Sequence, residues 1–132
     1  GATQAISIVE VPNRYLAGIT EVALKSYYAD KTNWRKMLQN DVLPIDLIAE
    51  KLKVESLIPA EVQEFYHLDK NDLYEMHFPV LNHPVKVNSL NLDKTPHFQG
   101  KLTGIKGQYL IFEDGIVFNV RGYEGYAISI NI

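Results

Sequence analysis

From about Leu73 to the C-terminus, β-branched and aromatic residues alternate with polar ones, and glycine and proline recur at short intervals. This pattern predicts short strands joined by tight turns. Asp114-Gly115 and Lys106-Gly107 are the expected hairpin turns, since the pair aspartate-glycine favours a two-residue turn. The expected strands span residues 73–78, 85–92, 98–105, 108–112, 116–120 and 126–130. So many short strands in so few residues predict a small antiparallel β barrel or a strongly bent sheet.

A further strand is predicted near the start of the chain. Ile6 and Ile8 alternate with polar residues, and Pro12 ends the pattern. We expect this strand to lie at a sheet edge, and exposed edges pair readily with other chains. A homodimer through residues 4–11 is therefore expected.

The part of the chain between this strand and the β-rich region predicts helices. The first runs to about Tyr28, the second carries Trp34, and a third lies near residues 46–52, which are good helix formers. Residues that favour a helix start recur at suitable places: Asn13, Asp30 or Thr32, and Pro59.

Charge divides the chain into three parts. Residues 1–38 carry a net charge of +2, residues 39–83 carry −6 and residues 84–132 carry +1, which gives −3 overall. The chain as a whole is therefore not a strongly basic nucleic-acid binder. We expect an α+β fold with a strand-helix-helix part over residues 1–40, an acidic helical connector over 41–72, and a small β domain over 73–132.

Several classes of function are excluded or disfavoured by the composition. The chain has no cysteine, which excludes disulfides, thiolate metal sites and a cysteine nucleophile. No apolar run approaches the roughly 20 residues of a membrane span, and the first residues do not resemble a signal peptide, so a cytoplasmic protein is expected. The four histidines lack the spacing of a helical zinc site and are expected to be ordinary surface or half-buried residues.

Basic and aromatic residues are interleaved at both ends of the chain. Lys31-Thr32-Asn33-Trp34-Arg35-Lys36 can neutralise phosphates and stack a base, although the pattern also fits a helix whose Trp34 is anchored in the core, which we favour. The aromatic residues of the C-terminal part are equally suited to a binding surface or to the filling of a small core. The candidate nucleic-acid contacts are Lys31, Trp34, Arg35, Lys36, Lys106, Tyr109 and Arg121.

Glu21 is the carboxylate of greatest interest. Lys25 follows it at helical spacing, so an exposed ion pair within one helix is the simplest interpretation. Such a pair stabilises a helix by only about 0.3–0.5 kcal/mol.

Five stretches together resemble the bacterial family called domain of unknown function 2797. The longer members of that family have a cysteine-rich, zinc-ribbon-like segment followed by a segment similar to the GIY-YIG nuclease fold. The resemblance therefore implies that this chain is the C-terminal part of a larger protein and begins where the GIY-YIG-like segment ends. The stretches that carry it span residues 15–25, 30–35, 89–94, 102–112 and 119–121.

The resemblance also gives Glu21 a second interpretation. In GIY-YIG domains a glutamate on a helix after the third strand holds a divalent metal, and Glu21 follows residues 6–11 in the corresponding place, with Lys25 and Asn33 also fitting the pattern. A lone carboxylate holds Mg²⁺ poorly, because that ion takes several oxygen ligands. We therefore expect no cofactor in this fragment, Mg²⁺ only with the missing segment, and no nuclease activity.

Two functions are expected from these observations. The first is a non-catalytic nucleic-acid-binding fragment of a larger GIY-YIG-like protein. The second is a protein-interaction or structural module that packs on the missing N-terminal half.

Overall fold

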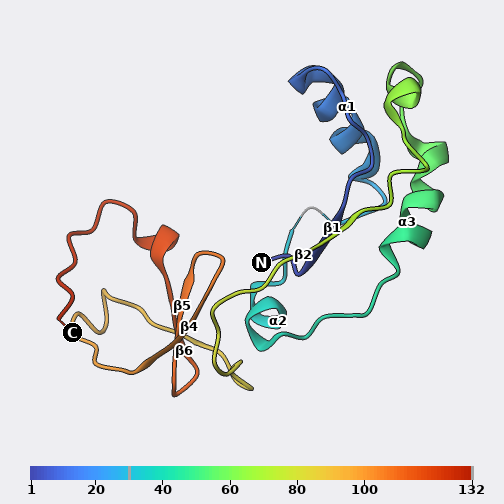
Figure 1. Ribbon diagram of the computed structural model, residues 1–132. Coiled ribbons are helices and arrows are strands. Elements are labelled where there is room, and N and C mark those ends of the chain that lie inside the picture. The colour runs from blue at the N-terminus through green and yellow to red at the C-terminus, as the bar shows by residue number, and fades with distance from the viewer. Residues whose placement is uncertain (30, 132) are drawn as a thin grey trace. The chain divides into compact units, whose positions relative to one another are not determined.

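The computed structural model describes residues 1–29 and 31–131, and these form the α+β fold that the sequence predicts. The chain divides into two compact units (Figure 1). Unit 1 contains Gly1, Trp34–Val42 and His77–Ile132, and unit 2 contains Ala2–Asn33 and Leu43–Met76. Each unit is therefore assembled from segments that are far apart in the sequence.

Unit 2 combines helices with a small sheet. Strands β1 (Gln4–Ile6) and β2 (Leu73–Glu75) run antiparallel, and Ala5 lies opposite Tyr74. The strand at the start of the chain thus has a neighbour within the chain. The described elements are β1 (Gln4–Ile6), α1 (Arg14–Leu24), α3 (Leu47–Val54), the 3-10 helices η1 (Glu55–Leu57) and η2 (Ala60–Phe65), and β2 (Leu73–Glu75).

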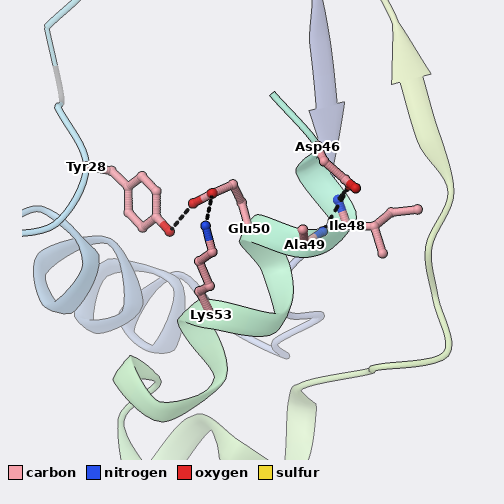
Figure 2. A network of polar contacts seen from close by, with 6 residues as sticks. All are labelled: Tyr28, Asp46, Ile48, Ala49, Glu50 and Lys53. Atoms are coloured by element: carbon pink, nitrogen blue, oxygen red, sulfur yellow. Dashed lines mark hydrogen bonds and ion pairs between the residues drawn. The ribbon is translucent and has the colours of Figure 1, made fainter. Parts of the chain in front are cut away.

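Polar caps start the helices of unit 2. The Asn13 side chain accepts a hydrogen bond from the backbone N–H of Leu16 at 3.0 Å, which confirms it as the N-cap of α1. Asp46 caps α3 by accepting from the N–H groups of Ile48 and Ala49, both at 3.0 Å (Figure 2). Helix α1 ends earlier than predicted, and the predicted alternative cap Asp30 lies outside the described residues.

Unit 1 is built on an open sheet of four strands, β3 (Asn88–Ser89), β4 (Leu102–Lys106), β5 (Tyr109–Phe112) and β6 (Ile116–Asn119). Their order in the sheet is β3-β6-β5-β4. The closed barrel among the predicted alternatives does not form in the described residues, because the bridge between Val80 and Gly104 covers β4 at one edge while β3 ends the other. The other elements of unit 1 are α2 (Trp34–Gln39) and the 3-10 helix η3 (Val120–Tyr123).

One strand pair differs from the antiparallel arrangement that was predicted. Strand β3 pairs with β6 in parallel, whereas β4, β5 and β6 are antiparallel. The two hairpins impose their direction on β4, β5 and β6, but the long connection after β3 imposes none. Both predicted hairpins form, but the first turns at Gly107-Gln108, one residue later than predicted, because Lys106 is the last residue of β4 and pairs with Tyr109. Gly107 and Gly115 adopt positive φ values of 58° and 71°, which glycine tolerates best.

The last predicted strand is wrong. Residues 126–130 are irregular, and the side chains of Tyr126, Ile128 and Ile130 are exposed at 52%, 50% and 77%. The pattern of alternation is present in this segment, but no described strand pairs with it. Alternation alone does not make a strand, because the backbone also needs a neighbour to bond.

The core of unit 1 lies between α2 and the sheet. It is formed by Leu38, Tyr109, Ile111 and Val117, and Trp34, Met37, Val80 and Val87 pack against it.

Candidate nucleic-acid interface

The predicted contact residues fall into different parts of the fold. Lys31 lies in unit 2, whereas the other six lie in unit 1. Within unit 1 they come from α2, from the β4–β5 hairpin and from η3.

Trp34 is anchored in the core of unit 1, as the sequence favoured. Its ring stacks on that of Tyr109, with the centroids 5.5 Å apart and the planes 9° from parallel. The guanidinium of Arg35 lies 4.3 Å from the centroid of the Trp34 ring, a cation–π contact. This arrangement fixes the start of α2 against β5.

Lys106 is buried, with only 1% of its surface exposed. Its Nζ donates a hydrogen bond to Oδ1 of Asn40 at 3.0 Å and lies 5.6 Å from the centroid of the Phe78 ring. Burial lowers the pKa of the Lys106 ammonium. Since Tyr109 is also buried, at 7% exposure, these two side chains have little surface to offer a ligand.

Lys36 and Arg121 are exposed but differ in their surroundings. The Lys36 ammonium lies 3.4 Å from a carboxylate oxygen of Asp41, so its charge is partly neutralised. Arg121 lies on η3, which Asn119 caps by accepting from the backbone N–H of Gly122 at 3.2 Å. Among the described residues, Arg121 forms no ion pair.

Three aromatic rings, two of which follow Arg121 closely in the sequence, form a row that the sequence did not single out. Tyr123 stacks on the buried ring of Phe118, with centroids 5.2 Å apart. Tyr126 meets Tyr123 edge-to-face at 5.2 Å, and its own ring is about half exposed. We call Phe118, Tyr123 and Tyr126 the aromatic row.

A tight turn brings the two tyrosines together. The N–H of Tyr126 donates to the carbonyl of Tyr123 at 3.1 Å. Glu124 has φ −57° and ψ 130°, and Gly125 has φ +90°, which are values typical of a type II turn with glycine at its third position. The Glu-Gly pair is thus the sequence signal by which this contact could have been found.

Tyrosine hydroxyls tie the aromatic row to the loop after β3. The N–H of Leu92 donates to the Tyr123 hydroxyl at 3.0 Å, and the Tyr126 hydroxyl donates to Oδ1 of Asp93 at 2.9 Å. The hydrogen bond to Asp93 raises the pKa of Tyr126. Asn91 folds the loop by accepting from the N–H groups of Asp93 and Lys94.

The two units carry opposite charges. Unit 1 has seven basic and five acidic residues, a net charge of +2, and unit 2 has six basic and eleven acidic residues, a net charge of −5. In the described part of unit 1, Lys86, Lys94 and Arg121 are exposed and form no ion pair. Two of these three cations belong to the segments that hold the aromatic row.

Unit 2 contains a polar network centred on Glu50 (Figure 2). The Tyr28 hydroxyl donates to one carboxylate oxygen of Glu50 at 3.0 Å, and Lys53 donates to the other. Lys53 and then Tyr28 lower the pKa of Glu50, while burial and the bond to Glu50 raise the pKa of Tyr28. The network ties the segment after α1 to α3, and no group in it resembles a nucleophile with its base.

Glu21 is exposed on α1. In residues 1–29 and 31–131, no three or more histidine or acidic side chains are grouped so that they could hold a metal ion. The single carboxylate does not fit Mg²⁺, so no catalytic step is assigned to it. None of the helices described is long and apolar enough to cross a membrane.

A family model matches residues 1–128, which includes residues of both units. The chain belongs to the family described as protein of unknown function (DUF2797). Searches of curated proteins and of solved structures found no match. In this DUF2797 chain, the aromatic row is hydrogen-bonded to Leu92 and Asp93, which lie in residues 89–94, one of the stretches that carry the family resemblance.

Proposed function

We propose that this DUF2797 protein is a non-catalytic nucleic-acid-binding protein and that unit 1 carries the interface. The observation that carries the proposal is the separation of charge, since unit 1 has a net charge of +2 and unit 2 has −5. Unpaired cations and an exposed tyrosine occur together on unit 1, and these are the groups that bind phosphates and bases. A cytoplasmic location and descent from a larger GIY-YIG-like protein are parts of the same proposal.

The basic residues of the segment 31–36 belong to different units, so their contributions to binding can be tested separately. Arg35 and Lys36 lie on α2 of unit 1, and Lys31 lies in unit 2. We expect Arg35→Gln/Lys36→Gln to weaken binding of labelled oligonucleotides in fluorescence anisotropy and to reduce its salt dependence, because two phosphate contacts are removed. Lys31→Gln tests separately the predicted contact that lies in unit 2. Unchanged affinity in the double variant would show that α2 is not part of the interface.

A protein-interaction module is the second candidate, and a specific observation favours it. Unit 1 exposes large apolar side chains, among them Leu81 at 80% and Val85 at 92%, in addition to Ile128 and Ile130. Large apolar side chains that solvent reaches to this extent are material for a protein-binding surface. Light scattering of the wild type and of Ile128→Ser/Ile130→Ser tests this function. Self-association that the double substitution abolishes supports it, whereas a monomeric wild type counts against pairing with a second copy.

A further inference from the structure

We infer that the ring of Tyr126 is a stacking platform for an unpaired base of single-stranded nucleic acid, with Lys94 and Arg121 binding the adjacent phosphates. The inference rests on the proposed function and names the residues at which the nucleic acid would bind. Tyr126 is 52% exposed, while Tyr123 is half-buried and Phe118 is buried. The aromatic row therefore exposes the ring of Tyr126 to solvent and connects it, through Tyr123, to the buried ring of Phe118.

Tyr126 is held in place before any ligand binds. The type II turn and the edge-to-face contact with Tyr123 position its ring, and the hydrogen bond from its hydroxyl to Asp93 restrains the far end. A ring that is already ordered loses little conformational entropy on binding. This restraint distinguishes Tyr126 from Tyr15, which is 69% exposed on α1 and is held by no ring contact or hydrogen bond among the described residues.

The charges around the ring fit a phosphate backbone. Arg121 precedes Tyr123 on η3, and Lys94 follows Asp93 in the loop, so a cation lies on each segment that holds the ring. Asp93 uses one carboxylate oxygen to hold Tyr126, and Glu124 is the remaining nearby acid. Glu124→Gln should therefore strengthen binding.

The exposed ring selects single strands over duplexes. The bases of a duplex are stacked on one another, so an aromatic side chain at the surface can reach a base only where the strand is unpaired. Stacking of this type is tolerant of sequence, because every base has an aromatic face. A preference for single strands with little dependence on base identity is expected.

The test compares Tyr126→Ala, Tyr126→Phe and the double variant Lys94→Gln/Arg121→Gln by anisotropy with a labelled single-stranded oligonucleotide. Tyr126→Ala should lower the affinity roughly tenfold without changing the salt slope, since a base contact and no charge is lost. Tyr126→Phe keeps the ring and should retain most of the affinity, which a merely structural role through the Asp93 bond would not allow. The double variant should reduce the salt slope by about 1.4.

The outcomes separate this site from the proposed function. If the wild type binds and Tyr126→Ala binds equally well, the site is wrong and the proposed function stands. If Tyr126→Phe loses as much affinity as Tyr126→Ala, the hydroxyl acts structurally and the stacking role is wrong. If the wild type binds no oligonucleotide at low salt, both proposals fail. Trp34 fluorescence of each variant reports whether unit 1 is folded, because this is the only tryptophan of the chain.

Discussion

Trp34 stacks on Tyr109 with their ring planes 9° from parallel, and this contact joins α2 to β5. The chain segments before and after residues 34–42 both belong to unit 2. The aromatic pair therefore helps to hold α2 in unit 1, although the residues before and after this segment belong to unit 2.

Loss of the aromatic pair should destabilise unit 1. We expect Tyr109→Leu to lower the free energy of unfolding by about 1–3 kcal/mol, because the ring contact is lost and the buried site is repacked. Trp34 emission should shift to longer wavelength as its ring becomes hydrated. Tyr15→Leu is the control, since Tyr15 is exposed and its replacement should change stability by less than about 0.5 kcal/mol. Equal effects of the two substitutions in urea unfolding would contradict the assignment of Tyr109 to the core.

The buried ammonium of Lys106 should make stability depend on alkaline pH. Burial holds its pKa below the ordinary value of 10.5, so the unfolded chain binds more protons than the folded one between these two values. Stability relative to Lys106→Met is constant below the folded pKa and rises as the pH increases from there toward 10.5. Urea unfolding of the wild type and of Lys106→Met between pH 7 and 10.5 measures the difference. If the difference in the free energy of unfolding between the wild type and Lys106→Met does not change with pH, the Lys106 ammonium is in contact with water.

Gly18 and Gly125 both have room for a Cβ atom but differ in backbone conformation, so replacing each with alanine tests the effect of the φ angle alone. A Cβ atom at either Gly18 or Gly125 would meet no atom within 4 Å, but only Gly125 has a positive φ, +90°. Gly18→Ala should stabilise helix α1 by about 0.5–1 kcal/mol, because glycine loses more entropy in a helix than alanine does. Gly125→Ala should destabilise the protein by about 1–2 kcal/mol through left-handed strain. Thermal unfolding measures both, and changes of the same sign would refute the explanation.

The Glu50 network should be visible in an acid titration. Lys53 and Tyr28 hold the pKa of Glu50 below 4.5, so the stability that they provide is present above pH 4.5 and is lost as the pH falls through the folded pKa. Tyr28→Phe removes one donor and should raise the Glu50 pKa toward 4.5 in a carbon-13 NMR titration of the carboxyl group. Tyr27→Phe, at an exposed position, is the control. An unchanged Glu50 pKa in Tyr28→Phe would mean that the hydrogen bond does not persist in solution.

Local signals predicted much of the fold. The caps at Asn13 and the turn at Asp114-Gly115 depend on the backbone needs of a few adjacent residues, which the sequence displays directly. The anchoring of Trp34 is the interpretation that the sequence analysis favoured for residues 31–36, and in the fold Trp34 and Met37 pack against the core that contains Leu38.

Other features depend on contacts between distant residues and left no local signal. The parallel pairing of β3 with β6 and the burial of Lys106 against Asn40 are decided by tertiary packing. Residues 126–130 carry the alternation of a strand, yet the turn at Gly125 directs Tyr126 onto Tyr123 and no described strand is available beyond it. The aromatic row depends on the turn at Glu124-Gly125, whose sequence signal stands next to a stretch that alternates like a strand.

The most direct test of nucleic-acid binding is the salt dependence of fluorescence anisotropy for the wild-type chain with labelled single- and double-stranded DNA and RNA. We predict binding at low salt that favours single strands, with the logarithm of the association constant falling linearly as the logarithm of the salt concentration rises. No binding to any of the four probes at low salt would contradict the account.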